Sequence, residues 1–212
     1  IVSNLEYSQK DTIDLFVYIS GEGTTYNGKK VILPYDANLT KSSSFYYVDD
    51  LYNNLSKIQS MPDVGEITLF MDVDFNNASF VQNLEKKVEI VEKKGKKKKG
   101  KKKKGKKDEP EEPKVLLPKE IMPPKSITAF FASNTTQIAY EHPDYKNSMF
   151  TYFLLKGMKG EADNGDKSLT VSELYNYVQK NVEDKTKVLY NELPQVPILY
   201  TSTPDRVLYN LP

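Results

Sequence analysis

The sequence predicts an α/β layered domain built around a mostly parallel sheet. Three short apolar runs, at 14–21, 67–73 and 126–133, have the length and composition of strands buried in such a sheet. Segments with the apolar spacing of helices occur between and after them, at 48–58 and 150–158. Strands that alternate with helices are typical of layered α/β folds. A length of 212 residues suits one such domain.

The remaining elements continue this alternation. Residues 31–37 indicate an extended segment that runs into a turn. A helix is expected over 168–182, because Thr170 is a good N-cap and Glu173 follows three residues later as the second half of a capping box. Residues 197–201 indicate a last strand.

A lysine-rich tract interrupts the pattern. Residues 86–125 contain 17 Lys and 7 acidic residues, whereas the rest of the chain contains 13 basic and 22 acidic residues. Lysine runs separated by glycine, followed by acidic and proline-rich sequence, cannot bury enough apolar surface to offset the entropy of ordering. We therefore expect 86–125 to be a disordered linker. The net charge of +1 is the sum of an acidic domain and a basic linker.

The lysines of this linker suggest weak contact with a polyanion, such as nucleic acid, anionic lipid or an acidic protein surface. Glycine rather than aromatic residues separates the lysine runs, so base stacking is not indicated. The plainer interpretation is a solvated loop. The lysines concerned are Lys96, Lys97, Lys98, Lys99, Lys101, Lys102, Lys103 and Lys104.

The composition excludes several chemistries. The chain has no cysteine, so it has no disulfide, thiolate metal site or cysteine nucleophile. Its one histidine, His142, lies in a turn-like segment and is expected to be exposed and without a catalytic role. We expect no cofactor. No apolar run approaches the roughly 18–20 residues of a membrane-spanning helix, and the start lacks a signal-peptide pattern, which favours an intracellular location.

Six short motifs follow one another along the chain. The first ends in Ser20-Gly21-Glu22-Gly23 and the third in Asp72-Val73-Asp74-Phe75, each after an apolar run. Residues 150–163 read Phe-Thr-x-x-Leu-Leu-x-Gly-Met-x-Gly-x-Ala-Asp. The others are 31–37, 132–137 and 173–178 together with 195–197. In this order they resemble the caspase-like peptidases, especially the metacaspase and bacterial caspase-like branch.

This resemblance implies a caspase-like three-layer sandwich. Residues 1–85 would form its large-subunit-like part and 126–212 its small-subunit-like part, with the linker 86–125 at the junction where the family varies freely. The family domain begins with a strand–helix–strand unit, for which this sequence has no matching residues. We therefore expect the sheet to lack its first strands and to carry an open edge.

The resemblance also locates the family's catalytic dyad. Glu22 stands where the family has its catalytic histidine, and Asp74 stands where it has its cysteine nucleophile. A carboxylate is a poor nucleophile toward an amide and places negative charge where the oxyanion would form. We therefore expect a degenerate dyad without catalytic residues, a chain that is not an enzyme, and a structural or protein-interaction role in a larger chain or assembly.

Two alternatives give these carboxylates chemical roles. Glu22, Asp72 and Asp74 could bind Ca²⁺ or Mg²⁺, or two of them could share a proton and support hydrolysis, as in acid proteases. The plain interpretation is that they are solvated residues of a decayed site. In metacaspases an aspartate at the position of Asp72 helps to select basic substrate residues, so Asp72 with Gly21 and Gly23 suggests a residual Lys/Arg pocket. Otherwise Asp72 would cap backbone amides at the end of its strand.

One further motif, at residues 163–174, does not match a calcium-binding loop. Residues 163–174 have the outline of a calcium loop, but the fifth position is Lys167 and the twelfth is Leu174 rather than Glu. A turn followed by an N-capped helix explains the segment better.

Overall fold

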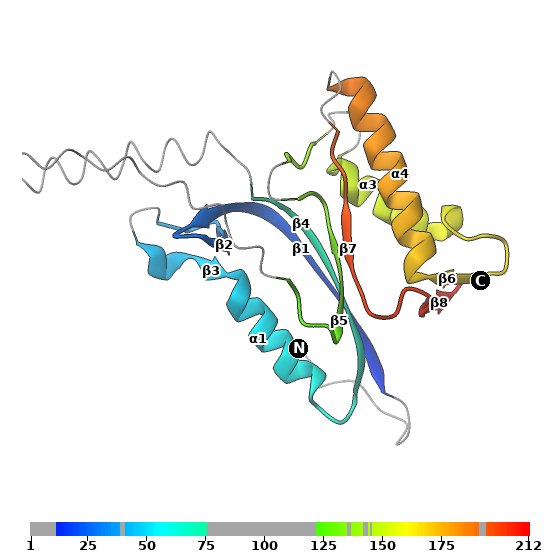
Figure 1. Ribbon diagram of the computed structural model, residues 1–212, viewed down its shortest axis with the longest axis horizontal. Helices are drawn as coiled ribbons and strands as arrows, with labels where there is room; N and C mark the ends of the chain where they lie inside the picture. Colours follow the sequence, from blue (N-terminus) through cyan, green and yellow to red (C-terminus); the bar gives the residue numbers. More distant parts are fainter. Residues whose placement is uncertain are drawn as a thin grey trace, which may run out of the picture.

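The computed structural model describes residues 12–38, 41–75, 122–134, 137–141, 144, 146–190 and 194–212. Its centre is a six-stranded sheet in the order β3-β2-β1-β4-β5-β7 (Figure 1). The strands are β1 (Ile13–Tyr26), β2 (Lys29–Ile32), β3 (Tyr46–Tyr47), β4 (Val64–Asp74), β5 (Ile127–Phe131) and β7 (Ile198–Tyr200). β1, β4 and β5 are parallel to one another, and the outer strands pair antiparallel. The predicted α/β class with a mostly parallel sheet is confirmed.

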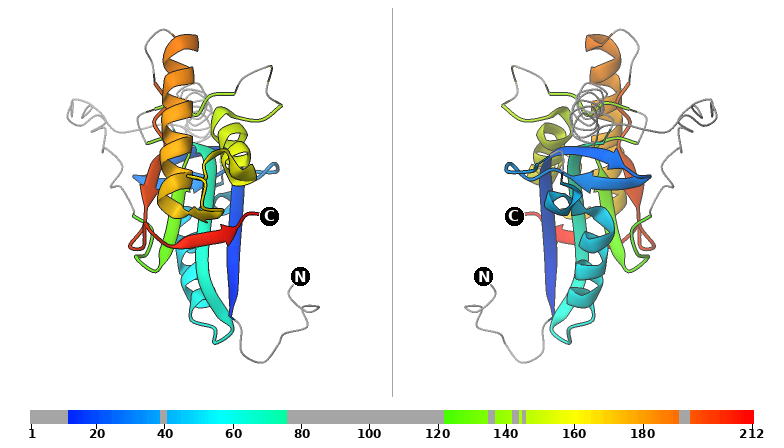
Figure 2. Two further views of the ribbon diagram at one scale, coloured as in Figure 1. Left: turned by 90° about the vertical axis from the view of Figure 1, so that its right-hand side faces the viewer. Right: turned by 90° about the vertical axis from the view of Figure 1, so that its left-hand side faces the viewer.

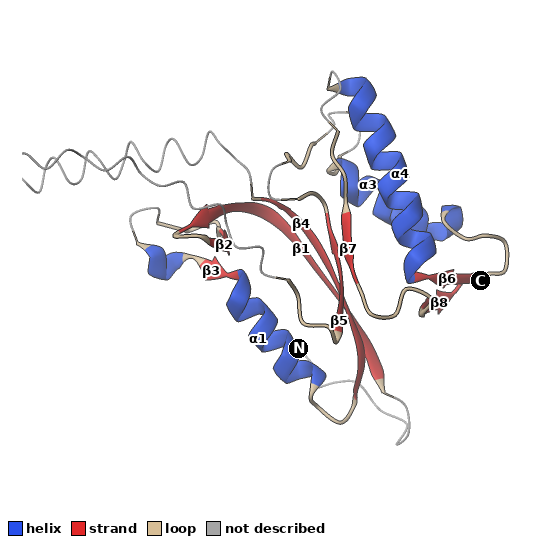
Figure 3. Ribbon diagram, viewed as in Figure 1, coloured by secondary structure: helices blue, strands red, loops and turns tan. Residues whose placement is uncertain are grey.

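Helices cover both faces of this sheet (Figure 3). On one face α1 (Val48–Gln59), preceded by a 3₁₀ turn at Ser42–Ser44, packs its apolar side on β4 and β5. On the other face α3 (Met149–Lys156) and α4 (Val171–Leu189) pack around Phe70 and Phe130. A π-helical turn at Gly157–Glu161 extends α3. Three layers result, as the resemblance implied.

The expected capping box of the last helix is present, but the helix begins later than predicted. Thr170 Oγ1 accepts from the Glu173 amide at 3.3 Å, and the Thr170 amide donates to Glu173 Oε2 at 2.8 Å. Residues 168–170, assigned to this helix from the sequence, form β6 (Ser168–Thr170) instead. β6 pairs with β8 (Val207–Asn210), a partner some 40 residues away that local spacing does not reveal.

β1 lies in the parallel sheet as predicted, but it is less buried than its apolar run indicates. Along Asp14–Ser20 the side chains alternate between exposed and partly buried, and Phe16 and Tyr18 keep 45% and 49% of their surface exposed. The reason is pairing: β2 reaches only Gly23–Tyr26, so among the described residues no strand adjoins the outer edge of Ile13–Glu22. Within the described ranges this stretch of β1 therefore has a neighbouring strand on one side only.

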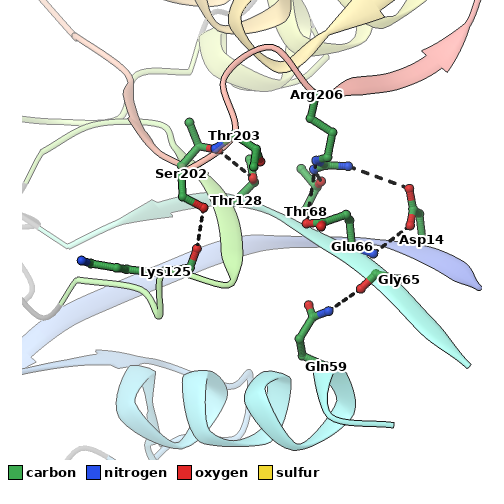
Figure 4. A network of polar contacts seen from close by, with 11 residues as sticks. Asp14, Gln59, Gly65, Glu66, Thr68, Lys125, Thr128, Ser202, Thr203 and Arg206 are labelled. Atoms are coloured by element: carbon green, nitrogen blue, oxygen red, sulfur yellow. Dashed lines mark hydrogen bonds and ion pairs between the residues drawn. The ribbon is translucent and has the colours of Figure 1, made fainter. Parts of the chain in front are cut away.

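Arg206 joins the segment before β8 to the starts of β1 and β4 (Figure 4). Its Nη2 donates to Thr68 Oγ1 at 2.6 Å, and its side chain is only 13% exposed. Nη1 and Nε lie 3.9 Å from the carboxylates of Asp14 and Glu66, respectively. Asp14 also accepts from the Glu66 amide at 2.7 Å, which ties the two strand starts together.

Several sequence-based expectations concern residues that are not described. Residues 76–121, which include the lysines singled out above, and His142 lie outside the described ranges. The boundaries 1–85, 86–125 and 126–212 remain a prediction, although strands from both sides of the tract share one sheet. Within the described ranges no helix is long and apolar enough to cross a membrane.

Candidate functional site

A pocket of about 730 Å³ opens at the carboxyl ends of β1 and β4, beside the start of α3. This is the edge of a parallel sheet at which α/β folds place their sites. Three parts of the chain line the pocket: two neighbouring strands, the loop before α3 and the first turn of α3. The lining residues are Tyr18, Ser20, Gly21, Glu22, Asp72, Asp74, Ala139, Glu141, Lys146, Asn147, Ser148 and Thr151.

The parallel register of β1 and β4 brings the predicted carboxylates together. Ser20 is the partner of Asp72, and Glu22 is the partner of Asp74. Because side chains alternate along a strand, all four point to the face that α3 and α4 cover. Glu22 and Asp74, which stand at the dyad positions implied by the resemblance, are therefore neighbours in one pocket.

Asp72 is a buried carboxylate in a shell of hydroxyl groups. The residue is 5% exposed. Its Oδ2 accepts from Thr151 Oγ1 at 2.5 Å, from Ser148 Oγ and, at 3.4 Å, from the Tyr18 hydroxyl. Hydrogen bonds to an ionised group are among the stronger ones in proteins, and they compensate for burial of the charge. The partners are side-chain hydroxyls rather than the backbone amides that a strand-end cap would bind.

The start of α3 supplies two of these hydroxyl groups. Ser148 is the N-cap of α3, and its Oγ accepts from the Thr151 amide at 3.0 Å while donating to Asp72. The positive end of the helix dipole thus faces the carboxylate. Thr151 Oγ1 also lies 2.6 Å from the Tyr18 hydroxyl. Sequence reasoning missed Tyr18 and Ser148, and it recorded Thr151 only as part of a family motif.

The charge of the pocket is strongly negative. Four acidic side chains, Glu22, Asp72, Asp74 and Glu141, line it together with one basic side chain, Lys146. Such a lining favours a cationic ligand group. In the part of the chain that the structure describes, no three carboxylate or histidine side chains are grouped so that they could hold a metal ion.

Of the two glycines of the motif at residues 20–23, Gly21 lines the pocket and Gly23 packs against the end of β4. A Cβ atom on Gly23 would lie 2.6 Å from Val73 Cγ1 and 2.7 Å from Phe75 Cδ1, so a larger residue would push β1 away from the end of β4. Gly21 has φ +156° and open space around it, and it lines the pocket directly. The structure thus places Gly21 but not Gly23 in the predicted residual pocket.

The caspase domain family model matches residues 1–209. The match covers almost the whole chain, including every strand and helix that forms the pocket. The protein therefore belongs to the caspase domain family, as the motifs indicated. No curated protein matches the sequence.

The prediction that the chain is not an enzyme is wrong in the light of this match, because the caspase domain family is normally proteolytic. That prediction depended on two replaced side chains, Glu22 and Asp74. Their replacement removes thiol chemistry, since the chain has no cysteine, but it leaves a formed pocket with paired carboxylates. Carboxylates can activate water, so the loss of a thiol does not by itself exclude hydrolysis.

Proposed function

We propose that the pocket binds a peptide through a Lys or Arg side chain, as the recognition step of a caspase-family peptidase domain. The observation that supports this proposal is Asp72, a buried carboxylate held on the pocket wall by hydroxyl groups. A buried carboxylate forms a strong, charge-assisted hydrogen bond with a cationic group that enters the pocket.

The hydrogen bonds of Asp72 leave one side of the carboxylate for a ligand. All of its bonds to described residues are made by Oδ2. Oδ1 is then the acceptor for an ammonium or guanidinium group that enters the pocket. Glu22, Asp74 and Glu141 line the same pocket, and their negative charge raises the local concentration of cationic side chains.

A binding assay with matched peptides tests the proposal. Fluorescent peptides that differ only in Arg, Lys, Gln or Glu at one central position are titrated with the protein, and anisotropy is recorded. We expect the Arg and Lys peptides to bind at least about tenfold more tightly than the Gln peptide, since a hydrogen bond to a charged group contributes about 1.5–3 kcal/mol. Asp72→Asn should remove this preference, and Asp184→Asn, on the exposed side of α4, should keep it. Equal binding of all four peptides would overturn the proposal.

A second candidate function is hydrolysis of the bound peptide by the carboxylate pair Glu22 and Asp74. The observation that favours it is their direct pairing in the strand register inside the pocket. One carboxylate accepts a proton from water, the water oxygen bonds to the peptide carbon, and the other carboxyl group donates a proton to the leaving amine as the C–N bond breaks.

Turnover measurements separate binding from hydrolysis. Peptides that bind are incubated with the protein, and fragments are identified by mass spectrometry. Glu22→Gln and Asp74→Asn should each abolish cleavage while the peptide still binds, because both groups are needed for the proton transfers. Cleavage that survives both substitutions, or no cleavage by the unmodified protein, would contradict this second function.

A further inference from the structure

A fully buried glutamine connects one wall of the pocket to the rest of the fold. Gln195 lies between the end of α4 and the start of β7, and none of its surface is exposed. Its Nε2 donates to the Ala132 carbonyl at 2.9 Å, and its Oε1 accepts from the Tyr140 amide at 2.8 Å. Its own amide donates to Thr186 Oγ1 on α4 at 2.9 Å. The side chain of Gln195 thus attaches the loop before α3 to the end of β5.

The Ala132 side of Gln195 leads to the carboxylate of the pocket. The Ala132 amide donates to the Met71 carbonyl at 2.9 Å, and Met71 directly precedes Asp72 on β4. The residue Ala132 is therefore held by β4 through its amide and by Gln195 through its carbonyl. In this way Gln195 is connected to the strand that carries Asp72.

The Tyr140 side of Gln195 leads to the same carboxylate by another route. The Tyr140 carbonyl accepts from the Met149 amide, in the first turn of α3, at 2.9 Å. Ser148, the residue before Met149, donates to Asp72. The two routes close a ring of hydrogen bonds that begins and ends on β4, and Gln195 contributes two bonds to it.

The loop that Gln195 holds supplies part of the pocket lining. Ala139 and Glu141, on either side of Tyr140, line the pocket. α3 and α4 lie side by side on one face of the sheet (Figure 2), and Tyr190 at the end of α4 stacks on Tyr140 with ring centroids 3.9 Å apart. The Tyr190 hydroxyl donates to the Glu141 carbonyl at 2.7 Å. The loop is therefore held by residues that follow α3 in the chain, while its own residues line the pocket.

We propose that Gln195 is a positioning residue, which holds the loop Ala139–Glu141 and Ser148 in the arrangement around Asp72 that admits a Lys or Arg side chain. The inference rests on the proposed function of this pocket. Glutamine suits the role because its planar amide has both a donor and an acceptor, and the two backbone groups that it joins are a carbonyl and an amide. A side chain that lacks them would leave two backbone groups unpaired, and the loop would have to move to pair them again.

Two variants separate positioning of the pocket from stability of the fold. Gln195→Met has an unbranched side chain of similar length and removes both side-chain hydrogen bonds. Thr186→Val removes the hydroxyl that accepts from the Gln195 amide, and it leaves the bonds to Ala132 and Tyr140 in place. Both changes leave buried backbone groups without a partner, so both should lower the melting temperature. Only the first should alter the pocket.

Anisotropy titrations with the Arg and Gln peptides described above measure the effect on recognition. We expect Gln195→Met to weaken binding of the Arg peptide about tenfold, comparable to the loss of one hydrogen bond to a charged group. Binding of the Gln peptide should change much less, because only a cationic side chain uses the alignment of Asp72. Thr186→Val should keep the preference of the unmodified protein. A purely structural role would instead weaken binding of both peptides equally, through the amount of folded protein.

Amide hydrogen exchange, recorded by NMR without peptide, gives a readout that does not depend on the proposed function. In Gln195→Met the amides of Tyr140 and Met149 should exchange faster, by a larger factor than the amides of α1 on the opposite face of the sheet. If the unmodified protein does not prefer the Arg peptide, the proposed function fails, and the exchange rates alone decide whether Gln195 holds the loop.

The positioning role would be overturned by either of two results. One is a preference for the Arg peptide that survives Gln195→Met, and the other is equal acceleration of exchange at Tyr140, Met149 and α1. Should Gln195→Met fail to fold, Gln195→Asn takes its place, because its amide is one methylene too short to reach both Ala132 and Tyr140 and should change binding and exchange in the same direction.

Discussion

Replacing Arg206 by methionine measures how much the contacts of Arg206 with the starts of β1 and β4 contribute to stability. The hydrogen bond from Nη2 to Thr68 Oγ1 involves a charged donor and contributes about 1.5–3 kcal/mol. The carboxylates of Asp14 and Glu66, at 3.9 Å and nearly half exposed, add about 1 kcal/mol or less each. Against these gains, Nε and Nη1 are buried without a hydrogen-bond partner among the described residues, which costs about 1–3 kcal/mol per group.

The stabilisation from the guanidinium contacts and the cost of its unpaired N–H groups are thus of similar size. Methionine keeps the apolar part of the side chain. We expect Arg206→Met to lower the free energy of unfolding by only about 1 kcal/mol and Arg206→Ala, which also leaves a cavity, by about 2 kcal/mol or more. Urea unfolding with a shared slope gives both values, and a double-mutant cycle with Thr68→Val isolates the hydrogen bond. Equal losses for the methionine and alanine variants would refute the reasoning, because the guanidinium rather than its stem would then supply the stability.

Three further predictions concern other parts of the chain. Thr170→Ala should lower the free energy of unfolding by about 1 kcal/mol, measured by urea denaturation, because it removes the N-cap of α4. The hydrogen bond from Tyr177, aided by Lys156, lowers the pKa of Glu161 from its usual 4.5, so the stability it contributes is present above pH 4.5 and is lost as the pH falls through the lowered pKa. Glu161→Gln should therefore flatten the loss of melting temperature on acidification in this range, and an unchanged acid profile would contradict the assignment. Deletion of 94–107 should abolish binding to heparin, and in the intact chain that binding should weaken steeply with salt; binding that persists after the deletion, or that ignores salt, would refute a role for the lysines.

The sequence predicts well those elements whose signal is local. The apolar runs identify β1, β4 and β5, and the capping box of α4 is present at Thr170 and Glu173. Elements that depend on distant pairing escape prediction: β6 has only three residues and forms because β8 lies beside it. The exposure of β1 is missed for the same reason, since an apolar run has one composition whether its outer edge is covered or open.

The residues of the candidate site also differ in how well the sequence predicts them. Its carboxylates Glu22, Asp72 and Asp74 are indicated by motif, because each follows an apolar run within a family pattern. The hydroxyl groups that hold Asp72 come from positions 54, 76 and 79 residues away along the chain, and no spacing rule connects them. The mistaken prediction of a non-enzyme has another origin, because it judged the domain by two side chains rather than by the pocket around them.

The location of Asp72 has a consequence for the integrity of the chain. The carboxylate belongs to the part before residues 76–121, whereas Ser148 and Thr151, which bind it, belong to the part after them. The β4–β5 ladder joins the same two parts along five residue pairs. The connection between the two parts therefore consists of a strand ladder and hydroxyl–carboxylate bonds as well as the polypeptide backbone, and a single cut within 76–121 would leave all of these contacts, and the pocket they frame, in place.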